Sequence, residues 1–191
     1  MATEVMDVQW PQEHTYSTLS WLTGIATPNL SAYRHGSKPM SATVVARIQT
    51  AGRTDPAGPI VAGRLLCYPQ LALVVKRHMD ADPVHCTRLV RQTVQQLQLL
   101  DDERDIAAYH IKPPTTGDVR WNALITGVAA HTWSLSHDGA SLDWTTQLRP
   151  VAQWWEPGTM PARWRDWNLV HTPPSLRERR VIFPTQWLEA V

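Results

Sequence analysis

The sequence predicts an α+β protein: a single mixed, mostly antiparallel sheet flanked by helices, followed by an irregular arm rich in tryptophan and proline. Three observations predict this class. Short runs of β-branched residues alternate with helix-like patterns, a long amphipathic segment stands between them, and all periodicity ends near Pro150. A chain of 191 residues has the size of one domain. We therefore expect an α+β domain over 1–149 and an arm over 150–191 that packs on it.

The first elements are expected to be a short strand and two helices. Residues 5–8 are a strand candidate. Apolar residues near helical spacing follow from His14, and Gly24 is a typical stop signal, which predicts a helix between them. Pro28 favours the first turn of a brief second helix that ends near Gly36.

Three strands are predicted next. β-branched residues dominate 43–49, and the strands 60–66 and 71–77 follow after a loop of turn-forming residues at 50–58. The last of these strands begins with five consecutive apolar residues, a pattern typical of a strand buried on both faces.

The segment 83–100 predicts a helix with one face in the core. Asp82 can accept hydrogen bonds from the free amides of the first turn, and Pro83 costs no hydrogen bond there. Apolar side chains recur at helical spacing along one side, while the opposite side is polar. The apolar stripe consists of Cys86, Val90, Val94, Leu97 and Leu100.

A strand, a helix and a hairpin complete the predicted domain. The hairpin is indicated by Asp138-Gly139, because this pair between two extended runs is typical of a tight turn. The predicted segments are a strand over 106–112, a helix from Thr116 or Asp118 to Thr126, and hairpin strands over 128–136 and 141–148.

This order of elements resembles the GCN5-related N-acetyltransferase fold over residues 5–148. In that family, the fourth strand leads into a loop at the start of the long helix, where backbone amides hold the pyrophosphate of acetyl-CoA. The resemblance implies that acetyl-CoA or another acyl thioester is the cofactor. Where the family has glycines in this loop, the sequence has Asp80 and Asp82, so the CoA loop would be degenerate. The implied cofactor-binding residues are Val75, Lys76, Arg77 and His78.

The same resemblance implies an acyltransferase that moves an acyl group from a thioester to an amine. Tyr109 and His110 would lie on a strand beside the cofactor, where only one of two neighbours can face the site. His110 could deprotonate the amine, because histidine titrates near neutral pH; a structural histidine bonded to the backbone is the alternative. No metal is expected, since no two histidines share a helix face beside a carboxylate.

The arm combines tryptophan with arginine. Both residues are favoured in protein interfaces and both suit stacking on nucleic-acid bases, while burial against the chain's own domain is a third interpretation. A protein partner would make the chain a non-catalytic subunit of a larger assembly, such as a nucleoprotein complex, a virus particle or a secretion machine. A nucleic-acid-binding protein is the second alternative. The candidate partner-binding residues are Trp154, Trp155, Arg163, Trp164 and Trp167.

Charge is unevenly distributed along the chain. Residues 31–53 carry Arg34, Lys38, Arg47 and Arg53 and no acidic residue, although the whole chain has a net charge of +1. Arginine far outnumbers lysine, which suits contact with anions or nucleic acid. A GC-rich coding sequence explains the same preference.

Several classes of protein are not expected. No run of apolar residues approaches the ~18 of a membrane span, and the start of the chain lacks the basic and apolar regions of a secretory signal. We therefore expect a cytoplasmic protein without a membrane partner. Cys67 and Cys86 are too few for a disulfide framework or a zinc cluster, and we expect both to be buried.

Overall fold

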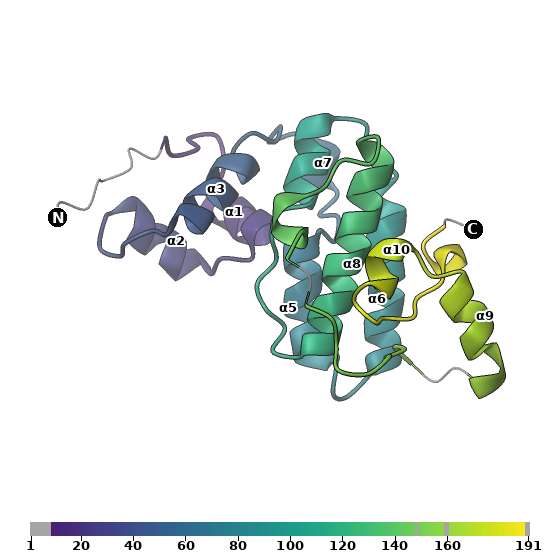
Figure 1. Cartoon of the computed structure of the whole chain (residues 1–191). Helices are drawn as coiled ribbons and strands as arrows, with labels where there is room; N and C mark the ends of the chain where they lie inside the picture. Colours follow the sequence, from purple (N-terminus) through teal and green to yellow (C-terminus); the bar gives the residue numbers. More distant parts are fainter. Residues whose placement is uncertain (1–8, 148, 159–160, 190–191) are drawn as a thin grey trace.

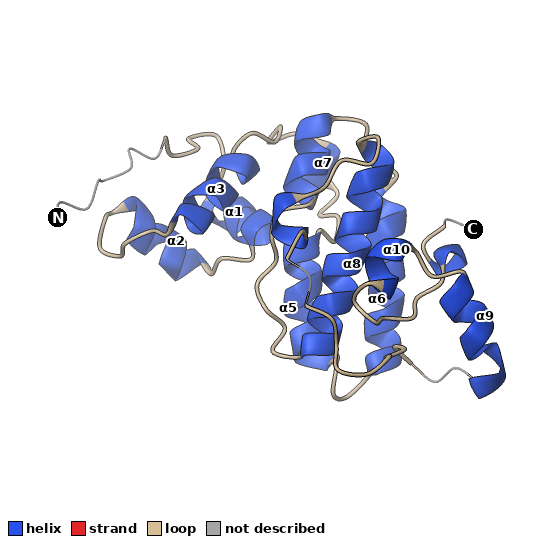
Figure 2. Cartoon of the chain, in the orientation of Figure 1, coloured by secondary structure: helices blue, strands red, loops and turns tan. Residues whose placement is uncertain are grey.

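The computed structural model, which describes residues 9–147, 149–158 and 161–189, is helical throughout (Figures 1 and 2). Within these residues there is no sheet, and the one strand-like feature is a parallel bridge between Trp155 and Val181. The predicted α+β fold is therefore wrong, and so is the resemblance to the acetyltransferase fold that was built on its strands. The strand predicted at 5–8 lies outside the described residues.

Four helices form the amino-terminal part of the molecule. The predicted helix after His14 is present, and Thr15 caps it by accepting a hydrogen bond from the Thr18 amide. The strand predicted at 43–49 is instead a helix, because Ser41 caps the Val44 amide and the buried residues recur every three positions. The helices are α1 (Tyr16–Thr23), α2 (Thr27–Arg34), α3 (Ala42–Ala51) and the short α4 (Pro59–Ala62), which replaces part of the strand predicted at 60–66.

The centre of the molecule is a helical bundle. The predicted strand 71–77 is instead part of a helix that packs against three others, and its apolar run 71–75 is covered on several sides by these helices. The helix predicted at 83–100 is confirmed, and Asp82 accepts a hydrogen bond from the His85 amide at 2.8 Å. The bundle consists of α5 (Tyr68–His78), α6 (Pro83–Leu97), α7 (Glu103–Tyr109) and α8 (Val119–Ser136).

The hairpin and the strand before it are also replaced by helix. α7 covers most of the predicted strand 106–112, and α8 continues through the predicted strand 128–136. Asp138 and Gly139 do adopt the positive φ angles of a turn, 48° and 83°, but they end α8 and do not join two strands. After them the chain forms a short 3₁₀ helix, η1 (Asp143–Thr145).

The carboxy-terminal residues share the core of the bundle. Gly127 of α8 faces α10, where a methyl group at its Cβ position would lie 2.5 Å from Leu176 Cδ2. The segment holds η2 (Ala162–Trp164), α9 (Arg165–Val170), α10 (Pro174–Arg177) and η3 (Thr185–Trp187). Its residues in the core are Val151, Leu176, Val181, Phe183 and Leu188. None of the helices among the described residues combines the length and the apolar character needed to cross a membrane.

Candidate nucleic-acid interface

The residues expected to be catalytic lie inside the bundle. The His110 ring is 1% exposed, with Nδ1 2.8 Å from the Ile106 carbonyl oxygen and Nε2 2.9 Å from the Thr132 hydroxyl. Because a carbonyl only accepts, Nδ1 carries the proton and Nε2 accepts from Thr132, whose oxygen lies 2.8 Å from the Tyr68 hydroxyl. Burial lowers the pKa of His110 to about 4. This neutral ring has no nitrogen left for a substrate.

Tyr109 has a similar structural role. Its hydroxyl oxygen lies 2.7 Å from the Leu66 carbonyl oxygen and 2.8 Å from that of Thr93, so it links α6 to the segment before α5. The side chain is fully buried, and its ring meets Tyr68 edge to face with centroids 5.9 Å apart. Neither residue of the expected catalytic pair reaches a surface where an amine could bind.

The residues expected to bind a cofactor form the end of α5. Val75 is buried in the core, while Lys76, Arg77 and His78 are exposed in the last helical turn. Cations at this position are favourable because the carbonyl end of a helix is negative. The described residues have no sheet that could splay to hold a thioester here.

Of the five candidates in the arm, four are exposed and one is turned inward. Trp155 packs inward, edge to face with Trp121 at 5.3 Å between ring centroids. Trp164 and Trp167 are exposed at 46% and 43%, and Trp154 at 40%. Arg163 lies over the Trp164 ring, 5.7 Å from its centroid.

The described residues contain no candidate site for metal or thiol chemistry. No group of three histidine, cysteine or acidic side chains is arranged to hold a metal ion. Cys67 and Cys86 are buried free thiols, as expected, and burial raises their pKa values to about 12 and about 11. Protonated, enclosed thiols are poor nucleophiles.

A different site is formed by α1, α2 and the turn between them. α1 ends at Gly24, whose φ of +68° is a left-handed conformation that side chains other than glycine rarely adopt. The Gly24 amide donates to the Ser20 carbonyl at 3.0 Å, which closes the helix. Ile25 turns into the core, and α2 begins after only three residues, Gly24 to Ala26.

The packing of α3 completes this unit (Figure 1). α1 contacts both α2 and α3, with Leu19 and Leu22 of α1 and Ile48 of α3 fully buried. α2 contributes one fully buried residue, Leu30, and Tyr33 is half-buried against the core, whereas Thr27 and Arg34 at its two ends are exposed. A three-residue glycine turn between two short helices is also found in the helix-turn-helix, in which the second helix enters the major groove of DNA.

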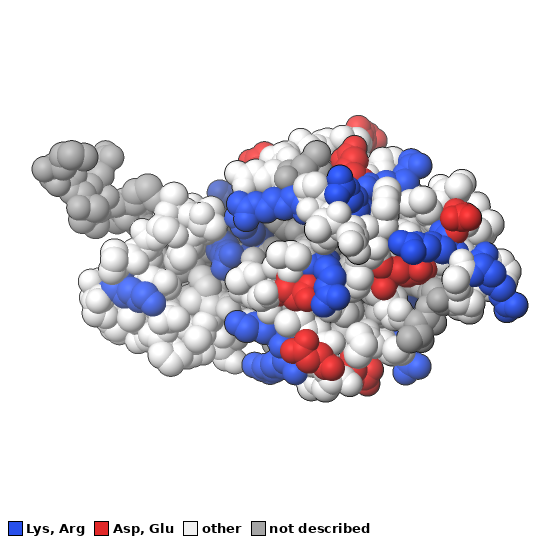
Figure 3. Space-filling view, turned by 60° about the horizontal axis from the view of Figure 1, so that its bottom comes forward, with Lys and Arg blue, Asp and Glu red and all other residues white. Residues whose placement is uncertain are grey.

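The electrostatics of this unit suit a nucleic acid. From His14 to Thr54 the sequence has four Lys or Arg residues and no Asp or Glu. Arg34 and Lys38 are exposed at the carboxyl end of α2 and just beyond it. In Figure 3 the end of the molecule formed by these helices shows basic side chains and no acidic one on the face in view. A surface without carboxylates does not repel phosphate.

The outer face of α2 carries hydrogen-bonding groups. Asn29 has its amide oxygen 3.2 Å from Lys38 Nζ, and Arg34 lies over the ring of Tyr16 at 5.8 Å. Thr27 is exposed at the start of the helix. Threonine, asparagine and arginine all make contacts with base edges or phosphates in protein–DNA complexes.

The sequence contained the signals for this site. The stop at Gly24 and the start near Pro28 predict two helices three residues apart, and the lack of acidic residues over 31–53 is visible in the sequence. The strand predicted at 43–49 concealed the unit, because it removed the supporting helix. Comparisons of the chain with models of protein families, with curated protein sequences and with solved structures find no match.

Proposed function

We propose that this protein binds duplex DNA, with α2 as the helix that enters the major groove. The observation that carries the proposal is the α1–α2 unit, whose second helix has a single fully buried residue and lies in an acid-free stretch. An α-helix fits the major groove of B-DNA, and its first residues read base edges. The nucleic-acid function expected from the tryptophan-rich arm is thereby moved to the opposite end of the chain.

The side chains divide into two roles. Asn29 can make paired hydrogen bonds to an adenine, so it is the proposed base-reading residue. Arg34 and Lys38 are the proposed phosphate contacts, because each is an exposed cation without a carboxylate within 4.0 Å among the described residues. Reading and positioning are therefore assigned to different residues.

Selection of duplexes from a random library, followed by affinity measurement over a range of salt concentrations, tests the proposal. Each phosphate contact contributes about one to the slope of log affinity against log salt. We expect Arg34→Ala with Lys38→Ala to lower that slope by about two and to weaken all sequences alike. Asn29→Ala should relax the sequence preference at one position.

The double variant Trp164→Ala with Trp167→Ala is the matched control. It removes two large exposed side chains at the other end of the chain and should leave DNA affinity and the salt slope unchanged. Loss of DNA binding in this variant, with retention in the Arg34 and Lys38 variant, would refute the assignment to α2.

The acyltransferase function is left without structural support. It was inferred from a strand order that the described residues do not contain, and the side chains assigned to it are either buried or dispersed on a helix end. A titration with acetyl-CoA followed by calorimetry remains its direct test, and heat of binding at low millimolar ligand would revive it.

A second candidate function is docking to a protein partner through α9. Trp154, Trp164, Trp167 and Val170 are exposed at 40%, 46%, 43% and 70%, and Arg163 and Arg165 lie among them. Exposed tryptophan and arginine together are typical of interface anchors. We propose a partner with an apolar pocket rimmed by carboxylates.

Affinity between the purified chain and a co-purified, identified partner tests this second function. Trp164→Ala with Trp167→Ala should weaken the complex about tenfold or more, whereas Arg34→Ala with Lys38→Ala should not change it. If the unaltered chain and both double variants bind the partner with equal affinity, α9 is not the docking surface.

A further inference from the structure

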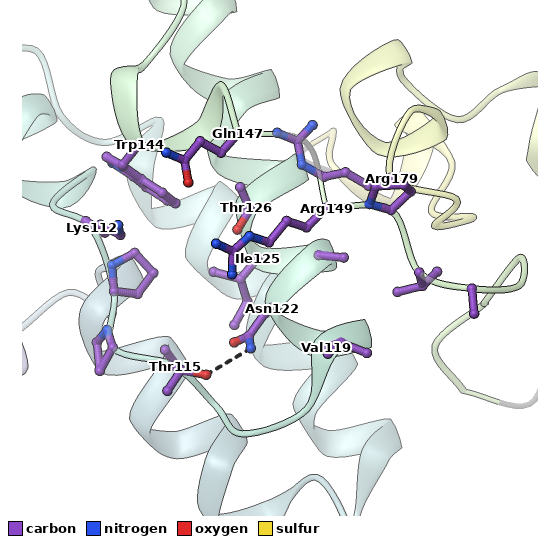
Figure 4. A pocket seen from close by; sticks show the side chains of 17 residues that line it. Lys112, Thr115, Val119, Asn122, Ile125, Thr126, Trp144, Gln147, Arg149 and Arg179 are labelled. Atoms are coloured by element: carbon purple, nitrogen blue, oxygen red, sulfur yellow. Dashed lines mark hydrogen bonds between the residues drawn. The ribbon is translucent and has the colours of Figure 1, made fainter.

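An open groove of about 410 Å³ lies beside α8, away from the outer face of α2 (Figure 4). One wall is the segment between α7 and α8, and the other is the chain that follows η1. Its volume falls within the range of small-molecule sites, roughly 300–1,000 Å³. The floor is formed by α8 residues such as Ile125 and Thr126, which lie between the two walls.

The groove is lined by cations and by no carboxylate. Lys112 lies on one wall, while Arg149 and Arg179 extend from the other side, with the Arg149 guanidinium over the floor (Figure 4). Among the described residues, the ion pairs join other side chains, and none includes these three. Three cations around one hollow give it a positive potential that attracts an anion.

Arg179 distinguishes the groove from an ordinary basic surface. Its side chain is 3% exposed, and its guanidinium donates to the carbonyl oxygens of Ser175, at 2.6 Å, and Thr145. Burial lowers the pKa of this guanidinium, and the neighbouring Glu178 carboxylate compensates the lost hydration only in part. The two carbonyls fix the orientation of the group in advance, and a bound anion would add opposite charge.

The other lining groups suit the remainder of an organic ligand. Trp144 forms one end of the groove, where its ring is held by a hydrogen bond of 2.9 Å from Nε1 to the His110 carbonyl oxygen. Asn122 is fixed by bonds to Thr115 and Thr116. A fixed indole beside three cations is suited to a molecule with a flat ring and a phosphate.

One wall of the groove also touches the α1–α2 unit. The Pro113 carbonyl oxygen accepts from Arg47 Nη2 of α3 at 3.3 Å. Pro114 Cδ lies 3.2 Å from the position that a Cβ would occupy on Gly24, the residue of the helix-turn-helix turn. A ligand that contacts Pro113 and Pro114 therefore lies next to residues that contact α3 and the turn before α2.

We propose that this groove binds a small phosphorylated molecule with a ring system, and that its binding changes the affinity of α2 for DNA. Arg149, Arg179 and Lys112 hold the phosphate, and the ring lies against Trp144. The binding step rests on the groove alone, and the effect on DNA rests on the proposed DNA-binding function.

Calorimetric titration of the full chain with ATP, pyrophosphate and adenosine, at constant ionic strength and without DNA, tests the binding step. We expect ATP to bind and adenosine to bind at least tenfold more weakly, since loss of charge-assisted hydrogen bonds costs about one decade or more. Arg149→Ala and Lys112→Ala should each weaken ATP about tenfold. Both side chains are exposed, so these variants retain the fold.

Arg77→Ala and Lys76→Ala are matched controls, because they remove the same charges from the exposed end of α5. They should bind ATP as the unaltered chain does. Equal affinity in the groove and control variants, or no heat with any of the anions, would overturn the proposal.

DNA affinity measured with and without saturating ATP tests the second step. A change of about threefold or more, which is lost in Arg149→Ala, is expected. An unchanged DNA affinity would refute the effect on α2 while leaving the groove as a binding site.

If no duplex binds under any condition, the proposed DNA-binding function fails, and the calorimetry still decides whether the groove binds a phosphorylated molecule. If Arg149→Ala weakens DNA as strongly as Arg34→Ala and no ATP binds, the groove holds DNA phosphates, and the proposal is wrong.

Discussion

Two short helices at opposite ends of the molecule, α2 and α9, are both exposed and differ in what they expose (Figure 1). α2 buries one leucine and exposes Thr27 and Arg34, with a half-buried Asn29 between them and no carboxylate nearby in the sequence. α9 buries only Asn168, while two tryptophans and a valine at or beside it are at least 43% exposed. The difference indicates that a polar face suits hydrated phosphates and base edges, whereas exposed indoles suit an apolar pocket on a protein.

α2 and α9 are both held by one core, and lowering the pH should have the largest effect on the stability of that core. His110 follows α7, which packs on α3, and bonds to Thr132 of α8, which carries α10. Burial holds the pKa of His110 near 4, below the ordinary 6.5. As pH falls, His110 therefore binds a proton in the unfolded chain before it does so in the folded one. Its contribution to the free energy of unfolding is fully present above pH 6.5 and is lost progressively toward pH 4, by about 3 kcal/mol.

Chemical denaturation across this pH range measures the effect. His110→Gln should flatten the dependence of the free energy of unfolding on pH. In the unaltered chain, DNA binding and the signal of the exposed indoles should change over the same pH range. The burial-lowered pKa values of His14 and His131 leave a smaller slope of the same sign in the variant. A variant with an unchanged slope would show that His110 is not the group responsible.

Gly127→Val should disturb the α9 end of the molecule selectively. The added Cβ would lie 2.5 Å from Leu176 Cδ2 and 3.0 Å from its Cγ, in a fully buried contact between α8 and α10. Overpacking of this kind costs about 2–3 kcal/mol. We expect lower stability by thermal unfolding with DNA affinity retained below the transition; a stability equal to that of the unaltered chain would mean that α10 moves freely on α8.

Gly24→Ala should disturb the α2 end. The residue has a φ of +68°, and the new methyl group would meet Pro114 and Pro69 at 3.2 and 3.3 Å, so we expect a loss of about 1–2 kcal/mol and weaker DNA binding. Gly36→Ala is the matched control, because Gly36 has a φ of +69° with no atom within 4 Å. Equal losses in both variants would assign the whole cost to the backbone and none to the contact with the groove wall.

Trp164→Ala with Trp167→Ala should have the smallest effect on stability. Both rings are more than two-fifths exposed, and substitutions at such surface positions usually change the free energy of unfolding by about 0.5 kcal/mol or less each. A large loss in thermal unfolding would place these indoles in the fold and not in a docking surface.

Local signals predicted the elements that carry their own start and stop. Asp82 and Pro83 predicted the beginning of α6, and Gly24 predicted the end of α1. These signals work because capping groups satisfy free backbone groups within a few residues of the chain. The same locality explains the outcome at Asp138 and Gly139, where a turn was predicted and found, but its neighbours were helix and coil.

The sequence by itself determined where α1 and α6 lie, the burial of both cysteines and the acid-free stretch that contains α2. The tertiary structure decided the fold class, because α5 packs against three other helices and its run of five apolar residues, 71–75, looks the same in sequence as a buried strand. It also decided the sites. The buried His110, the groove around Arg149 and Arg179, and the packing of α3 on α1 all depend on contacts between residues far apart in the chain, which no local pattern encodes.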